Sequence, residues 1–184
     1  MMKAILRSVY NAWKYRNLKK FGKNLALARD GIIAHPEELE IGENVFIAKG
    51  FVISAFEMKI GSNIMIGPYL VAECDDHIYN VPGKKMYEIR KQRNRAPITV
   101  EDDVWMGANV TILKGVVVRE GSIVGAGSVL TKSTVPYSIS LGLPAKPFRT
   151  RFTEEELKSH LSKIKSNYSF EEILNFWKEA KLLD

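Results

Sequence analysis

The sequence is poor in the residues that cross-link small folds or bind metals. It holds one cysteine, Cys74, and three histidines in 184 residues. An internal disulfide is therefore excluded, and a lone thiol cannot build a zinc site. No apolar run approaches the ~18 residues that a membrane span needs. The first residues also lack the compact apolar segment and small-residue cleavage site of a secretory signal. We expect a protein of the reducing cytoplasm.

Acidic residues are absent from the first 23 positions, which carry seven Lys or Arg. A second basic segment, residues 84–95, holds six Lys or Arg against one Glu, whereas the whole chain has 27 basic and 21 acidic residues. Basicity confined to two patches argues against a nucleic-acid partner. The segment 1–23 has the pattern of an amphipathic basic helix. Two roles stay open for it: peripheral contact with an anionic membrane, or packing on the end of the fold.

Aliphatic side chains recur every six residues over much of the chain. This period fits neither a helix, whose faces recur at 3.6 residues, nor an alternating strand. It is typical of a solenoid in which six residues form one short strand and a corner, and three sides close a coil of ~18 residues. The recurring side chains then point inward and stack. They are Val100, Met106, Ile112, Val118, Val124 and Leu130, and, in a second register that slips by one residue at Glu57–Lys59, Ile41, Ile47, Ile53, Ile60, Ile66 and Ala72.

The period is weak before residue 39 and vanishes between residues 73 and 97. We expect an irregular first coil with Ile32, Ile33 and Leu39 inward, and a long polar loop of the kind that is usually functional or disordered. After Pro147 the spacing becomes helical, with two capping boxes, Thr153/Glu156 and Ser169/Glu172. The predicted parts are an N-terminal amphipathic basic helix (1–24), a solenoid domain (25–149) with loop 73–97, and a C-terminal helical cap (150–184).

Four motifs in the second half resemble the hexapeptide-repeat acyltransferases. They are Val104–Asn109 (VWMGAN), Ile112–Val116 (ILKGV), Val124–Lys132 (VGAGSVLTK) and Gly142–Pro147 (GLPAKP). The resemblance covers residues 39–149 and lies nearest the maltose/galactoside, nodulation, streptogramin and polysaccharide O-acetyltransferase branch. It implies an all-β solenoid, namely a left-handed parallel β-helix. It also implies a homotrimer that binds acetyl-coenzyme A between neighbouring subunits and requires no metal.

The same resemblance assigns a catalytic base to His77, in the loop that leaves the solenoid. An imidazole can take a proton from an alcohol that attacks a thioester, and can then return it to the departing thiolate. Asp75 and Asp76 are candidates to orient that ring. Cys74 is expected to be a passive thiol. His35 and His160 lack a comparable setting and are expected to be structural or exposed.

The resemblance also assigns the coenzyme site. Trp105 would flank the pantetheine arm, an amide near Ala108 would donate to the thioester oxygen, and small residues would let backbone groups approach the ligand. Basic side chains further along would meet the phosphates. The predicted coenzyme-binding residues are Trp105, Ala108, Gly125, Ala126, Thr131, Lys132, Lys146 and Arg149.

The sequence thus predicts an acetyl-coenzyme A-dependent O-acetyltransferase acting on a carbohydrate or glycolipid hydroxyl in bacterial surface-polysaccharide synthesis. A small free disaccharide is disfavoured, because Ala48–Gly50 stands where sugar-specific members carry polar residues. Two alternatives stay open: an acetyltransferase of a xenobiotic or amino sugar, and a non-catalytic trimeric scaffold. A zinc carbonic anhydrase is disfavoured, because it would need three convergent histidines, whereas His35, His77 and His160 lie far apart and His160 falls outside the solenoid. Segment 84–95 either screens coenzyme phosphates, attracts an acidic polysaccharide or lipid-linked sugar, or is simply solvated.

Overall fold

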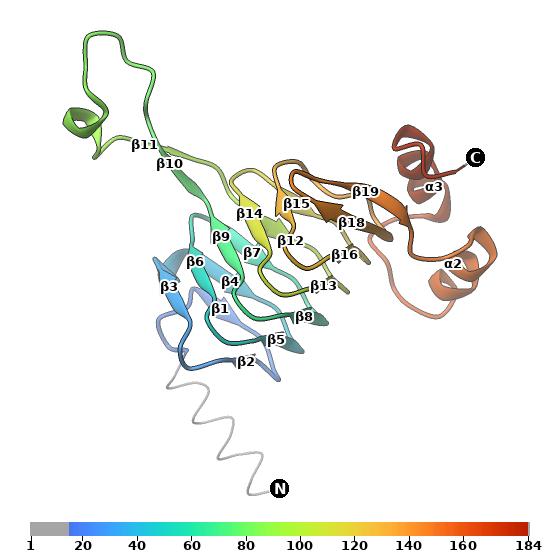
Figure 1. The fold of residues 1–184 in the computed structure, drawn as a ribbon. Coiled ribbons are helices and arrows are strands. Elements are labelled where there is room, and N and C mark those ends of the chain that lie inside the picture. The colour runs from blue at the N-terminus through green and yellow to red at the C-terminus, as the bar shows by residue number, and fades with distance from the viewer. Residues whose placement is uncertain (1–14, 184) are drawn as a thin grey trace, which may run out of the picture.

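Short strands wind into a triangular prism (Figure 1), as the six-residue period predicts. The computed structural model describes residues 15–183 and shows a left-handed parallel β-helix. Sheet A contains β1 (Lys20–Phe21), β4 (Leu39–Ile41), β7 (Met58–Ile60), β12 (Thr99–Val100) and β15 (Val117–Val118). Sheet B contains β2 (Ala26–Leu27), β5 (Val45–Ile47), β8 (Ile64–Ile66), β13 (Trp105–Met106), β16 (Ile123–Val124), β18 (Ser138–Gly142) and β19 (Ala145–Thr150). Sheet C contains β3 (Ile32–Ala34), β6 (Val52–Ser54), β9 (Val71–Glu73), β14 (Thr111–Leu113) and β17 (Val129–Leu130).

The inward positions form the core that the period predicts. Every member of both aliphatic series is at most 3% exposed. Each stacks on its equivalent one coil away: Val100 pairs with Val118, and Ile112 with Leu130. The predicted slip is also confirmed. Met58 is fully buried, and the extra residue, Glu57, sits at the corner with a left-handed φ of 45°.

Corners after sheet B are made of small residues because consecutive coils nearly touch there. A Cβ added to Gly107 would lie 2.6 Å from the backbone nitrogen of Ala126, closer than real Cβ contacts come. Gly67 meets the backbone of Gly107 in the same way. This edge, between sheets B and C, is therefore a column of small residues whose backbone is only partly buried.

The first coil departs from the prediction at one residue. Leu39 is buried and Ile33 is half-buried, but Ile32 is 62% exposed. In sheet C, Ile32 pairs with Val52 on the outer face, while Ile33 pairs with inward Ile53, so the alternation within the strand turns Ile32 outward.

Most of the predicted N-terminal helix (1–24) lies outside the described residues. Its described part, from Tyr15, is a turn followed by β1, so the helix does not extend through this part.

Loop 73–97 is a structured arm that projects from the prism (Figure 1). It contains an antiparallel stem, β10 (Asp75–His77) with β11 (Arg93–Arg95), and a 3-10 turn η2 (Met86–Ile89). The arm leaves sheet C after β9 and returns to sheet A at β12. The solenoid then resumes in register, with Ile112 beside Ala72.

The chain ends in a hairpin, β18 with β19, and two helices, α2 (Glu154–Leu161) and α3 (Phe170–Glu179). Both predicted capping boxes are present, at Thr153 and Ser169. The helices bury Leu157, Ile173 and Trp177 in a second small core against Tyr137. In the described part of the chain, no helix has the length and apolarity to cross a bilayer.

Buried polar groups join this cap to the last coils. Glu120 is 2% exposed; it accepts a hydrogen bond from the Tyr137 hydroxyl at 2.6 Å and another from the Asn167 amide at 2.9 Å. The Tyr168 hydroxyl donates to Glu101 at 2.9 Å. Burial, and then the hydrogen bond to Glu101, raise the pKa of Tyr168 to about 12, so it remains a neutral donor at physiological pH.

We predict that Tyr137→Phe lowers the free energy of unfolding by about 2 kcal/mol, because it removes a buried hydrogen bond to a carboxylate. Urea denaturation measures this change. Tyr87→Phe is the matched control, since Tyr87 is 73% exposed in the arm, and it should change stability by less than about 0.5 kcal/mol. Equal effects of the two substitutions would show that the Tyr137 hydroxyl does not hold the cap.

Candidate functional site

His77 lies in the stem of the arm, at the edge of the prism between sheets C and A. It is the last residue of β10 and pairs across the stem with Arg93. Its Nδ1 lies 3.1 Å from the Arg90 carbonyl oxygen. Arg93 Nη1 contacts the same Nδ1 and lies 3.1 Å from Nε2. The ring is thus held between a backbone acceptor and a guanidinium, and it remains exposed.

A shallow pocket of about 230 Å³ opens beside this ring. Its lining is mostly polar and comes from both strands of the stem and the turn that follows: His77, Ile78, Tyr79, Asn80, Arg93 and Asn94. The mixture of a titratable imidazole, two carboxamides, a phenol and a guanidinium suits a ligand rich in hydroxyl groups.

Asp75 and Asp76 directly precede His77 in sequence, but their carboxylates pair with other side chains. Asp75 Oδ2 lies 3.3 Å from the Nε atoms of both Arg93 and Arg95. Asp76 Oδ2 lies 3.2 Å from Lys114 Nζ. Among residues 15–183, neither carboxylate contacts the His77 ring, whose partners are the Arg90 carbonyl and the Arg93 guanidinium. Asp75 and Asp76 can therefore orient the His77 ring only indirectly, by holding the strands of the stem in place.

Lys114 fastens the stem to the next coil. Besides Asp76, its ammonium donates to the Asn94 carbonyl at 3.0 Å, so it bridges β10 and β11. Its side chain is only 20% exposed. Lys114 follows β14 at the sheet C to sheet A corner, directly beneath the arm, and therefore links the position of His77 to the solenoid.

Most predicted coenzyme residues gather on sheet B and on its edge with sheet C. Trp105 is 51% exposed on the outer face of β13. Ala108, Gly125 and Ala126 belong to the corners of small residues; there the Gly127 amide donates to the Ala108 carbonyl at 2.8 Å. Two further residues, Lys146 and Arg149, are exposed on β19, which extends the same sheet beyond β18.

The other two predicted coenzyme residues lie on the opposite edge of sheet C. Thr131 and Lys132 directly follow β17 and are exposed. Since β17 pairs with β14, they occupy the corner above Lys114, on the His77 side. The structure therefore brings His77, Thr131 and Lys132 to one edge and the other six residues to the opposite side of sheet C.

The two edges are far apart within one chain. From Ala108 to Lys114 the backbone runs along β14 for six residues, which span up to about 20 Å when extended. A thioester held against Ala108 would not reach the imidazole of the same chain. The two sets can meet only if another copy supplies one of them.

Outward-facing apolar side chains form ladders on two of the three sheets. On sheet B, Phe46, Met65 and Trp105 pair in consecutive strands and are each at least half exposed. On sheet C, Ile32, Val52 and Val71 pair in consecutive strands and are exposed; the same face also carries Leu113, which pairs with Glu73. Sheet A presents Lys20, Glu40, Lys59 and Thr99 instead. Contiguous exposed apolar ladders mark surfaces that meet other surfaces.

Cys74 lies at the base of the arm and is fully buried. Burial raises the pKa of its thiol, which disfavours the nucleophilic thiolate. This supports the expectation of a passive thiol.

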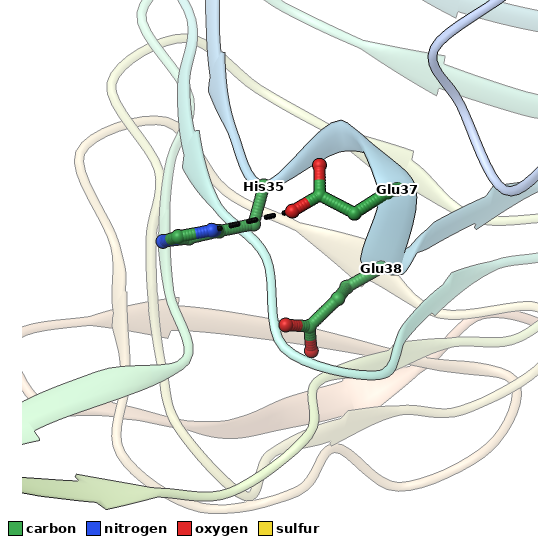
Figure 2. Close-up of side chains that lie close together, drawn as sticks. All are labelled: His35, Glu37 and Glu38. Atoms are coloured by element: carbon green, nitrogen blue, oxygen red, sulfur yellow. Dashed lines mark ion pairs between the residues drawn. The ribbon is translucent and has the colours of Figure 1, made fainter.

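One cluster of potential metal ligands exists among residues 15–183, at His35, Glu37 and Glu38 (Figure 2). It occupies the 3-10 turn η1 (Pro36–Glu38) between β3 and β4. His35 Nδ1 lies 3.5 Å from Glu37 Oε1, and Glu38 accepts a hydrogen bond from the Glu57 amide at 3.3 Å. His35 and Glu37 are exposed, as expected for His35, and the cluster contributes nothing to the His77 pocket.

Sequence reasoning missed Arg93, Tyr79 and Lys114. Finding them requires the strand register of the stem, which places Arg93 opposite His77. A polar loop has no hydrophobic pattern from which this register can be predicted. A usable signal was present, however: the acidic pair before His77 is matched by the alternating basic run Arg93–Arg95, and opposite charges favour cross-strand pairing.

Comparisons with known proteins agree with this architecture. A family model described as the hexapeptide repeat of succinyl-transferase matches residues 97–132. The chain is 28% identical over 123 residues to galactoside O-acetyltransferase of Escherichia coli, covering 62% of this chain and 58% of that protein. It is 36% identical over 74 residues to a chloramphenicol acetyltransferase of Klebsiella aerogenes, covering 40% and 35%. The chain thus spans less than two thirds of the length of these curated relatives.

Among solved structures, a hexapeptide-repeat acetyltransferase of Vibrio cholerae in complex with acetyl-coenzyme A is similar, with a TM-score of 0.69 and 25% identity over 80% of this chain and 79% of that one. The repeat pattern, the prism with its projecting arm and these similarities agree. Together they support placing the chain among the hexapeptide-repeat acetyltransferases.

Proposed function

We propose that this protein is an acetyl-coenzyme A-dependent O-acetyltransferase that acts on a carbohydrate hydroxyl. The observation that carries the proposal is the pair of edges beside sheet C. One presents an imidazole over a polar pocket, and the other presents a column of small residues beside a half-exposed tryptophan. Coenzyme A complexes of similar folds, and a relative named galactoside O-acetyltransferase, support the donor and the acceptor class.

His77 acts as the general base in this reaction. When the Arg93 guanidinium moves off Nε2, that nitrogen accepts the proton of the acceptor hydroxyl while the hydroxyl oxygen attacks the thioester carbonyl. Backbone amides near Ala108 stabilise the charge that develops on the carbonyl oxygen. The carbon–sulfur bond then breaks, and the imidazolium returns the proton to the thiolate. The products are the acetyl ester and free coenzyme A, so the step balances without a metal or redox partner.

A homotrimer would complete the site. If three copies place sheet C toward a common axis, each copy's edge between sheets C and A meets the edge between sheets B and C of the next copy. A cyclic contact joins different edges of identical subunits. The aliphatic outer face of sheet C supports this arrangement, because Val52, Val71 and Leu113 would leave water. His77 of one copy would then face Trp105 and Ala126 of its neighbour.

Lys146 and Arg149 would bind the coenzyme phosphates at the far end of the groove between two copies. The neighbouring copy would supply Thr131 and Lys132 from its edge between sheets C and A. The acceptor in this proposal belongs to bacterial surface-polysaccharide synthesis, and the protein works in the cytoplasm. Acetylation of a xenobiotic is the second candidate. It is favoured by the relative named chloramphenicol acetyltransferase, which is 36% identical over 74 residues.

Replacing His77 with Ala should lower turnover at least ~100-fold, because no other group in the pocket replaces a neutral imidazole as base. Thiol release from acetyl-coenzyme A, screened against sugars, nucleotide-sugars and lipid-linked sugars, measures turnover. Calorimetry should show coenzyme affinity within about twofold of wild type. Near-normal turnover in His77→Ala would remove this residue from the mechanism.

Two inactive variants should complement each other if the site is shared between copies. His77→Ala disables one edge, and Ala126→Trp fills the other at an exposed position. Unfolding the two together and refolding the mixture should restore about a quarter of wild-type turnover, the share of random interfaces that pair two intact edges. The control is a single chain carrying both substitutions, refolded alone. No recovery in the mixture would place the whole site within one chain.

Lys114→Met should lower kcat about 10-fold while leaving the coenzyme Kd unchanged, because it releases Asp76 and Asn94 and frees the stem that carries His77. Lys114→Arg keeps the charge and should recover most of kcat. A purely structural role would instead lower Tm in Lys114→Met and leave the kcat of the folded fraction intact, which would contradict the positioning role.

A further inference from the structure

The pocket beside His77 carries more positive than negative charge. Asp75 is shared by two guanidiniums, those of Arg93 and Arg95, at 3.3 Å each, and Asp76 is occupied by Lys114. Two carboxylates therefore face three cations at the base of the arm. Of these cations, Arg93 also lines the pocket and reaches the catalytic ring.

The rest of the arm adds to this excess. Lys84, Lys85, Arg90 and Lys91 are exposed, and Glu88 is the only acidic residue among positions 84–95. The Arg90 guanidinium lies 4.3 Å from the centroid of the Tyr87 ring, which holds it at the surface by a cation–π contact rather than by an acidic partner. Like charges gathered on a protruding arm produce a local positive field, and such a field steers anions toward it.

The remaining lining has the chemistry of a sugar site. Tyr79 is 72% exposed and offers an aromatic face, while Asn80 and Asn94 offer carboxamides that both donate and accept. A neutral sugar needs only these groups. Arg93 adds a guanidinium beside His77. Its planar fork would bind a ligand that carries a carboxylate or a phosphate.

We propose that the acceptor is an anionic sugar, and that Arg93 binds its carboxylate or phosphate while the neighbouring hydroxyl is presented to His77. This inference rests on the proposed function and narrows its substrate class. Arg93 contacts both ring nitrogens of His77, so an acceptor anion that draws the guanidinium away also releases the base. Binding of an anionic acceptor would then free the His77 ring at the same time.

The same charge could instead serve the coenzyme phosphates. Within one chain, the basic residues predicted to meet the phosphates directly, Lys146 and Arg149, lie on β19, on the other side of sheet C from the arm, whereas Lys132 lies on the arm's side. If Arg93 binds an anionic acceptor, its replacement weakens acceptor binding. If Arg93 binds the coenzyme phosphates, its replacement weakens coenzyme binding, so separate binding measurements distinguish the two.

The test measures ligand binding to the full-length protein saturated with coenzyme A, at low salt. The probes are trigalacturonate, the neutral galactotriose that matches it, and glucose 6-phosphate. The variants are Arg93→Gln, which removes the charge, and Arg93→Lys, which keeps the charge but not the fork. Lys91→Gln is the control, since it removes one charge from the same arm outside the pocket. Affinity for coenzyme A is measured separately for each variant.

We expect at least one anionic probe to bind about fivefold or more tighter than galactotriose, as one charge-assisted contact would give. Arg93→Gln should abolish this preference and Arg93→Lys should reduce it, whereas Lys91→Gln should keep most of it. Preference for trigalacturonate identifies a carboxylate ligand, and preference for glucose 6-phosphate identifies a phosphate ligand.

Three results would overturn the proposal. They are the absence of any anionic preference, a preference that survives Arg93→Gln, and a loss of coenzyme affinity in Arg93→Gln with the sugar preference unchanged, which would assign Arg93 to the coenzyme. Failure of the proposed function looks different, because wild-type protein would then not bind coenzyme A at all.

Discussion

Close stacking of inward side chains at six-residue intervals is the constraint on which the rest of this structure depends. Each coil buries its aliphatic residues only against the coils above and below it, so the three corners must recur in strict register. Once the corners are fixed, every outward position is fixed as well. The column of small residues at Gly107 and Ala126, the tryptophan beside it and the arm on the opposite edge are all consequences of that register.

The register also explains why the predicted site is divided within one chain. A prism of this kind separates its edges by the width of a sheet, and His77 and most of the predicted coenzyme residues lie on different edges. In the proposed trimer, association through sheet C would remove the separation without moving any backbone, because different edges of identical copies would meet in a closed ring. Burial of the aliphatic ladder on sheet C would provide the driving force, and completion of the site would follow from it.

The arm follows other physical rules. It has few buried side chains, Ile89 among them, and its stem is held by ion pairs and by the Lys114 bridge to the solenoid. Such contacts are individually weak when exposed, so the arm can adjust around a ligand more readily than the prism can. In the proposed function, an adjustable arm carries the base and the rigid prism carries the coenzyme residues, so acceptor recognition would be separate from donor binding.

Residue spacing alone predicts the coils, their inward residues, the slip at Glu57–Lys59, both helix caps and the place where the coils give way to the arm that carries His77. All of these follow from local spacing, which needs no knowledge of distant contacts. The pairing of His77 with Arg93, the diversion of Asp75 and Asp76 to basic partners, and the division of the predicted site between two edges were decided only by the tertiary structure. A polar loop has no periodic hydrophobic pattern to set its register, and which edges face one another depends on the closure of the whole prism.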